Sequence, residues 1–191
     1  EAMNFAGVWE VPVVFVIINN GWAILLPRES QSAAETLAQK GIAAGIPGEQ
    51  VDGNDVTAVY DVVERALERA RNGGGASVIE AITYRLTDHS TADDANRYRD
   101  AEEVSEHWKA EPLIRIRSYL TEQQAWSKEN EENLLVEVDA EINAAVEKFD
   151  QSDPPPPEGM FDYLYAEVPN DLAEQRSDVI KRYSGKGASH A

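Results

Sequence analysis

The sequence contains no cysteine, few basic residues and no long hydrophobic run. Without cysteine, the chain cannot form disulfide bonds, thiolate zinc sites or a cysteine nucleophile. Lysine and arginine supply 17 of the 191 residues, against 35 aspartates and glutamates, so the net charge is −18. So acidic a chain repels phosphate backbones, which argues against a general nucleic-acid binder. The longest apolar run, residues 11–18, is too short to cross a bilayer, so we expect no membrane association.

The remaining composition indicates a soluble folded protein. Hydrophobic residues make up 42% of the chain, enough for one sizeable core, with or without an appendage. The excess of carboxylates is typical of halophilic proteins, whose self-repulsion is screened by salt, although an ordinary acidic protein is the alternative. The chain opens at Glu1 without a basic or apolar leader, so we expect a cytoplasmic protein. Residues 3–9 have helical spacing from the outset, and we expect the natural chain to start earlier.

Strand and helix patterns alternate in the first half of the chain. Residues 13–18 form a β-branched and aromatic run that suits a strand buried on both faces, and residues 77–84 form another strand. An alanine-rich stretch at 32–44 predicts a helix. A second helix is predicted from the apolar spacing over 56–70, with Asp55 as its N-cap. This order predicts an α/β fold with a parallel sheet, whose ligands bind beyond the carboxyl ends of the strands.

The second half of the chain shows only helical patterns. Apolar residues recur at helical spacing over residues 101–150. Consecutive prolines at 154–157 predict an extended spacer within a docking extension over residues 151–183. We expect residues 184–191 to be a disordered tail. These regions follow a first domain that we expect to cover residues 1–100.

The first candidate site is the polar pair Asn19 and Asn20, followed by Gly21 at the end of a strand. Such a sequence commonly forms only a turn. The alternative is a metal site, because an amide oxygen and a nearby backbone carbonyl are hard ligands that suit Mg²⁺. A Mg²⁺ ion would anchor a diphosphate and would need a carboxylate ligand from elsewhere.

The three histidines of the chain are too few for a transition-metal cluster. His107, in an acidic helix, and His190, in the tail, are typical of solvated side chains. His89 differs because it follows a predicted buried strand. A neutral imidazole there can donate to a phosphate or a reacting carbonyl, although a loop histidine is often structural.

Basic residues follow the acidic loop that contains His89. Arg97 and Arg99 are positioned to hold this loop by ion pairs with Asp93 or Asp94, and an anionic partner is the alternative. The glycine run at 73–75 follows a helix, so we interpret it as a helix end and not as a phosphate cradle.

Four segments together resemble the alpha subunit of thiamine-diphosphate-dependent 2-oxo acid dehydrogenases, the decarboxylating components of the pyruvate and branched-chain complexes. They are FVIINNGWAI at 15–24, VDGNDV at 51–56, EAITYR at 80–85, and HSTADD at 89–94 followed by Tyr98 and Arg99. The likeness follows the family's order and spacing from residue 1 to about residue 183. It implies part of a parallel-sheet thiamine-diphosphate-binding fold, followed by a helical carboxyl-terminal extension.

The resemblance also implies roles for single residues. Asn20 corresponds to the side-chain ligand of Mg²⁺, and Trp22 to the residue that offers a backbone carbonyl. His89 corresponds to the catalytic histidine near the cofactor, which helps to pass the acyl group to a lipoyl arm. The residues that match a loop ordered by cofactor binding are Ser90, Asp93, Tyr98 and Arg99. Ser90 stands where animal relatives are phosphorylated, but that regulation needs a dedicated kinase and is not implied here.

The family's Gly-Asp-Gly segment, with its Mg²⁺-binding aspartate, has no counterpart in this sequence. We therefore expect about half a cofactor site, in a carboxyl-terminal portion that is inactive alone. The resemblance implies a beta subunit in an alpha2-beta2 heterotetramer, a lipoyl-carrying acyltransferase partner and a 2-oxo acid substrate. Residues 40–48 are similar to bacterial pyruvate members, whereas 51–56 and 89–94 look closer to branched-chain members. We favour pyruvate; a branched-chain enzyme, a non-catalytic assembly module and a transketolase-like transferase are the alternatives.

Overall fold

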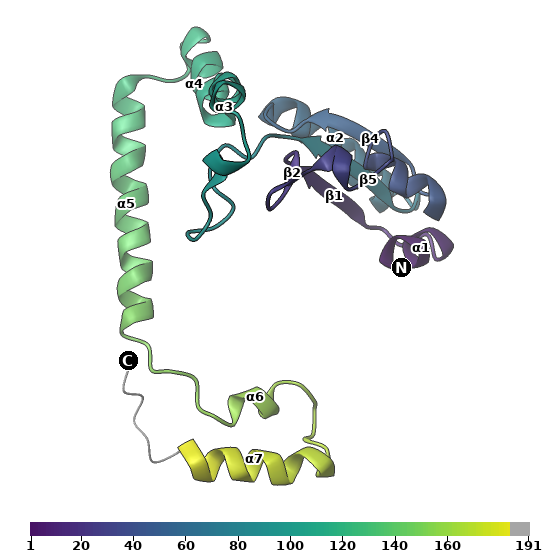
Figure 1. Cartoon of the computed structure of the whole chain (residues 1–191), viewed down its shortest axis with the longest axis vertical. Coiled ribbons are helices and arrows are strands. Elements are labelled where there is room, and N and C mark those ends of the chain that lie inside the picture. Colours follow the sequence, from purple (N-terminus) through teal and green to yellow (C-terminus); the bar gives the residue numbers. More distant parts are fainter. Residues whose placement is uncertain (184–191) are drawn as a thin grey trace. The chain divides into compact units, whose positions relative to one another are not determined.

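The computed structural model describes residues 1–183 (Figure 1). The expected tail, residues 184–191, and His190 lie outside the described residues. Contacts divide the chain into two compact units, the first covering Glu1–Ser127 and the second beginning at Lys128. The boundaries expected near residues 100 and 150 stay a prediction. Among the described helices, none combines the length and the apolar character needed to span a membrane.

A three-stranded parallel sheet forms the centre of the first unit, in the spatial order β1-β5-β4. β1 covers Val14–Asn19, β4 covers Gly48–Asp52 and β5 covers Ser77–Ile82. Both outer strands pair in parallel with the central β5. The helix α2, Val56–Arg71, connects β4 to β5. The predicted α/β fold with a parallel sheet is confirmed.

Apolar residues cover both faces of this sheet. On one face, α2 packs on a cluster formed by Val51, Val62, Ala66, Ile79 and Ala81. The opposite face carries Phe15, which packs with Ala6 of the short helix α1 (Ala2–Val8) and with Ile46. Because side chains alternate along a strand, consecutive residues of β5 contribute to different faces. All residues of β5 up to Ala81 are buried.

The first strand is less buried than its sequence predicts. Val16 is 52% exposed and Ile18 is 71% exposed, so the expectation of burial on both faces is wrong for this part of the chain. The reason is the sheet order, in which β1 has β5 on one side and no further strand among the described residues. On the α2 face only Val14 packs against the core. A continuous apolar run shows that a strand can be buried on both faces, but the strands and helices packed beside it decide whether its side chains are buried.

Residues 32–44 do not form the α-helix that their alanine content predicts. Only Ala38–Ala44 are helical, as the 3₁₀-helix η2. The backbone N–H of Ala38 donates to a side-chain oxygen of Glu80 at 2.8 Å, which anchors the start of η2 to the sheet. Gly45, with φ of 70°, ends η2 in the left-handed conformation that glycine adopts readily.

Two helices follow the sheet within the first unit, α3 at Ala101–Trp108 and α4 at Pro112–Glu122. Pro112 occupies the first turn of α4, where its missing N–H does no harm. In the second unit, the apolar side chains of α5, Lys128–Asp150, are all exposed. α6, Gly159–Asp162, and α7, Asn170–Tyr183, complete this unit. Before α6, residues 153–156 are neither helix nor strand and Pro157 lies in a turn, so the extended spacer stays a prediction.

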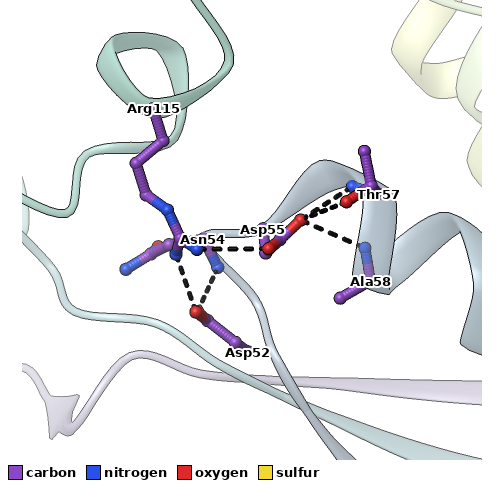
Figure 2. A network of polar contacts seen from close by, with 6 residues as sticks. All are labelled: Asp52, Asn54, Asp55, Thr57, Ala58 and Arg115. Atoms are coloured by element: carbon purple, nitrogen blue, oxygen red, sulfur yellow. Dashed lines mark hydrogen bonds and ion pairs between the residues drawn. The ribbon is translucent and has the colours of Figure 1, made fainter. Parts of the chain in front are cut away.

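Asp55 caps α2 as predicted, and its carboxylate also contacts Arg115 of α4 (Figure 2). Its carboxylate accepts the backbone N–H groups of Thr57 and Ala58 at 3.0 and 3.1 Å. The Thr57 hydroxyl donates to the same oxygen and is the main reason why the pKa of Asp55 lies below its ordinary value. Arg115 of α4 reaches Asp55 at 3.2 Å and Asp52 at 2.7 Å. The β4–α2 turn is therefore tied to α4 by charge.

Candidate functional site

β1 ends in a turn that two side-chain amides hold. The Asn19 side-chain oxygen accepts the backbone N–H of Gly21 at 3.2 Å, and that of Asn20 accepts the backbone N–H of Trp22 at 3.1 Å. Gly21 has φ of 83°, a conformation in which a residue with a Cβ is strained. The turn expected from the sequence is present. It brings the Asn20 side-chain oxygen beside the backbone N–H of Trp22, the residue whose carbonyl the resemblance pairs with Asn20 as a metal ligand.

A cavity of about 390 Å³ lies at this turn, at the carboxyl end of β1. Its lining includes Asn20, Trp22 and two cationic residues, Arg28 and Lys40. Trp22 begins β2, Trp22–Ala23, which forms a short hairpin with β3, Leu26–Pro27. Ligands of parallel sheets bind beyond the carboxyl ends of the strands. The position and positive charge of this cavity suit an anionic ligand.

The donor atoms at the turn fit Mg²⁺ in type but not in number. The side-chain oxygen of Asn20 and the backbone carbonyl of Trp22 are hard, neutral oxygen donors of the kind that Mg²⁺ takes. Across residues 1–183, no three acidic or histidine side chains gather in a way that could hold a metal ion. A charged ligand would therefore have to come from another segment or from an anionic cofactor.

Glu80 contacts this turn through the side chain of Asn19 and was not singled out from the sequence. Its side chain is fully buried in the central strand β5, with 0% relative exposure. It accepts hydrogen bonds from the Asn19 side-chain amide at 2.7 Å, the Ala38 backbone N–H at 2.8 Å and the Gln50 side-chain amide at 3.2 Å. The available signal was a charged residue inside the apolar run at 77–82, where an acidic side chain needs donors.

The loop that contains His89 follows β5 and is organised around Asp93. One oxygen of Asp93 accepts the backbone N–H of His89 at 2.9 Å and the hydroxyl of Tyr98 at 2.5 Å. These hydrogen bonds, that of Tyr98 first, hold the pKa of Asp93 below its ordinary value. Burial, followed by the hydrogen bond to Asp93, raises the pKa of Tyr98. Two of the residues expected to order this loop thus contact each other.

Arg99 also holds the loop, but through backbone groups. Its guanidinium donates to the carbonyls of Arg85 and Thr87, the latter at 3.0 Å. The expectation that Arg97 or Arg99 would form ion pairs with the loop carboxylates is wrong in this structure, since none is present among residues 1–183. A guanidinium has five donors in a fixed fork, which lets Arg99 bind two carbonyls at once.

Arg85 joins the loop to the turn and was also missed. One nitrogen of its guanidinium donates to the Tyr98 hydroxyl at 2.8 Å and to the backbone carbonyl of Ile24 at 2.6 Å. Ile24 lies at the tip of the β2–β3 hairpin. The rings of Trp22 and Tyr98 are also in contact, with centroids 5.6 Å apart. The structure therefore brings the Asn20–Trp22 turn and the loop-ordering residues together.

The remaining candidates lie on the surface or in a different environment. His89 and Ser90 are exposed, and within the described part of the chain the His89 side chain makes no hydrogen bond. His107 was expected to be solvated, and this expectation is wrong. It is half-buried and its ring stacks on Tyr84, with centroids 3.8 Å apart and planes 8° from parallel. This contact explains His107 as a packing residue between α3 and the end of β5.

Comparison with known proteins places these features in context. The family model described as "Dehydrogenase E1 component" matches residues 1–158. The chain is 45% identical to the pyruvate dehydrogenase E1 component subunit alpha of Staphylococcus epidermidis over 176 residues. The matched region covers 92% of this chain and 48% of the relative. The chain is 43% identical to the corresponding Staphylococcus aureus subunit, with the same coverage. The chain thus spans about half the length of these curated relatives.

Proposed function

This chain belongs to the dehydrogenase E1 component family, and we propose that it is the carboxyl-terminal portion of the alpha subunit of a pyruvate dehydrogenase. In this proposal it takes part in the decarboxylation of pyruvate with transfer of the acetyl group to lipoamide. The relatives support pyruvate as the substrate. The observation that carries the proposal is the Asn20–Trp22 turn at the carboxyl end of β1, in contact with the loop that bears His89.

The proposed cofactor is thiamine diphosphate with Mg²⁺. The Asn20 side-chain oxygen and the Trp22 backbone carbonyl would hold the metal ion. Arg28 and Lys40 add positive charge to the adjoining cavity, which favours a diphosphate. When bound, the thiazolium ring supplies a carbanion and an electron sink for decarboxylation. The contribution of this chain is therefore anchoring and orientation.

His89 is the proposed catalytic group of this chain. Its exposed imidazole stands on a loop whose backbone Asp93 and Arg99 hold in place. A ring N–H of His89 can donate to an oxygen of the substrate, and exposure lets a lipoyl arm approach it from outside. The fixed backbone and free side chain suit a group that must meet two partners in turn. Ser90 is exposed beside it, and its modification is not part of the proposal.

The whole activity requires more than this chain. The relatives are about twice as long, and the donor set described above lacks a carboxylate ligand for the metal ion. We propose that the chain is inactive alone and works in an alpha2-beta2 heterotetramer with a beta subunit, beside a lipoyl-carrying acyltransferase in the cytoplasm. A halophilic source also remains a proposal, which rests on the net charge of −18.

The test is to add the amino-terminal half of the alpha subunit, to co-express it with the beta subunit in high salt, and to measure reduction of an artificial acceptor. We expect turnover with pyruvate that requires thiamine diphosphate and Mg²⁺ and that Asn20→Ala abolishes. Asn143→Ala is the matched control, because the same amide is removed from the exposed surface of α5. Turnover confined to branched-chain 2-oxo acids would reassign the substrate. A folded complex without turnover on any 2-oxo acid would favour the assembly module.

A further inference from the structure

We propose that Glu80 is a positioning residue, which holds the Asn20–Trp22 turn through the side chain of Asn19 in the shape that a divalent cation requires. The inference deepens the proposed function and rests on it. Its starting point is the fully buried carboxylate of Glu80 in the middle of β5, which the chemistry described above does not use. Such a group is costly to bury unless it is fully hydrogen-bonded.

In the described part of the chain, the Glu80 carboxylate accepts hydrogen bonds from three neighbouring elements. The side-chain amide of Asn19 comes from β1, the backbone N–H of Ala38 from η2 and the side-chain amide of Gln50 from β4. Hydrogen bonds to a carboxylate are stronger than those between neutral groups. One side chain of the central strand is thus hydrogen-bonded to three neighbouring elements. An apolar side chain would fill the same space but could orient none of these groups.

Asn19 links Glu80 to the turn by hydrogen bonds. Its amide nitrogen donates to Glu80 at 2.7 Å, while its amide oxygen accepts the backbone N–H of Gly21 at 3.2 Å. Both ends of one amide are therefore in use. A reversed amide would place oxygen against the Glu80 carboxylate, so Glu80 fixes which end of Asn19 faces Gly21. The orientation of a side chain in the sheet thereby decides the hydrogen bonding of the turn.

Gly21 stands between the two residues that would hold the metal ion. Its N–H is bound by Asn19, and its carbonyl accepts the Arg28 backbone N–H at 2.8 Å. With Gly21 held from both sides, Trp22 is placed where its N–H donates to the Asn20 side-chain oxygen. Groups that orient metal ligands typically change metal affinity by about 10- to 100-fold when they are removed. Glu80 acts on the site through Asn19 and does not touch it.

The first experiment tests the geometry in the 191-residue chain without cofactor, by hydrogen exchange at the Gly21 amide. Glu80→Gln replaces one oxygen by an NH₂ group, which then faces an N–H donor of the cluster. We expect faster exchange at Gly21 in Glu80→Gln. Gln50→Met is the matched control, because it removes a donor from the same carboxylate without touching Asn19, and it should leave exchange at Gly21 unchanged. Unchanged exchange at Gly21 in a folded Glu80→Gln chain overturns the proposal.

The second experiment measures Mn²⁺ affinity in the presence of thiamine diphosphate in the assembled alpha–beta enzyme, by electron paramagnetic resonance of free Mn²⁺. Glu80→Gln and Asn19→Ala should each raise the Kd for Mn²⁺ by about tenfold or more. Because both act through one amide, the double variant should be no worse than the weaker-binding single variant. Gln50→Met should leave the Kd unchanged even if it lowers the melting temperature, which separates positioning from general stability.

Two results would overturn the inference in the second experiment. One is an unchanged Kd in folded Glu80→Gln, and the other is additive effects of Glu80→Gln and Asn19→Ala. If the unmodified complex binds no Mn²⁺, the proposed function fails, and the predicted effect of Glu80 on Mn²⁺ affinity fails with it. Exchange at Gly21 then still decides whether Glu80 holds the turn. The two failures are thereby distinguishable.

Discussion

The same substitution at two valines should have very different costs. Val78, in the central strand β5, is 1% exposed, whereas Val16, in the edge strand β1, is 52% exposed. Val→Thr keeps the β-branched shape and replaces a methyl group by a hydroxyl. At Val78 the hydroxyl has to leave water, at a cost of about 1–3 kcal/mol in proteins. At Val16 it stays hydrated, and surface substitutions change the free energy of unfolding by only about 0.5 kcal/mol in either direction.

Urea unfolding followed by circular dichroism measures both costs. A loss of about 2 kcal/mol at Val78→Thr corresponds to roughly a 30-fold shift of the unfolding equilibrium. With a slope of about 2 kcal/mol per molar urea, the midpoint should fall by about 1 M, while Val16→Thr leaves it in place. In the chain lengthened by the proposed amino-terminal half, Val16→Thr should become costly, because further structure then covers β1. Equal losses at the two sites in the present chain would refute the burial pattern and this reasoning.

Three further predictions concern charge and close packing. The pKa of Asp93 is lowered in the folded loop, so its stabilising contribution is present above the ordinary pKa near 3.8 and is lost as the pH falls through the lower folded value; protection of the His89 amide from exchange should therefore persist down to a pH near 3.8 and be lost below it. Arg115→Met removes both ion pairs to the β4–α2 turn, and should lower stability by less than about 1 kcal/mol in low salt and by less still in high salt; urea titrations at both salt concentrations check this. Gly53→Ala should lower the melting temperature, because the added Cβ would lie 2.9 Å from the Ile82 carbonyl oxygen; an unchanged melting temperature contradicts that close approach.

The helix α2 shows what the sequence could predict. Its start depends on Asp55 and its end on the glycines after residue 72, and both signals act within a few residues along the chain. The parallel sheet was predictable for a related reason, since strands separated by a helix need a crossover connection. Local chemistry therefore accounts for the existence and order of these elements.

Residues 32–44 and the strand β1 show where such signals stop. The start of η2 depends on Glu80, which lies 42 residues further along the chain from Ala38. The exposure of Val16 depends on which strands stand beside β1, and no pattern within residues 13–18 reports that. Tertiary contacts override propensity in the first case, and sheet order overrides pattern in the second.

The residues of the candidate site also fall into two groups, those marked by local sequence and those that depend on contacts distant in sequence. Asn20 and Trp22 lie two residues apart and His89 follows a recognisable strand, and the family resemblance of these local segments named all three before the fold was known. Glu80 and Arg85 act over 61 residues, on Asn19 and on the Ile24 carbonyl, and only the folded arrangement shows those contacts. The charged residue within an apolar strand was the one signal that pointed to Glu80 in advance.

The position of β1 at the side of the sheet also has a consequence for handling the protein. Within residues 1–183, β1 has one neighbouring strand, which leaves backbone donors and acceptors that can pair with another chain, and the apolar Val16 and Ile18 beside them favour such association. At neutral pH the net charge of −18 keeps copies apart. Near the isoelectric point of about 4.4 this repulsion vanishes while the open strand remains. Copies should then assemble edge to edge, so the colloidal stability of this chain depends on its carboxylates.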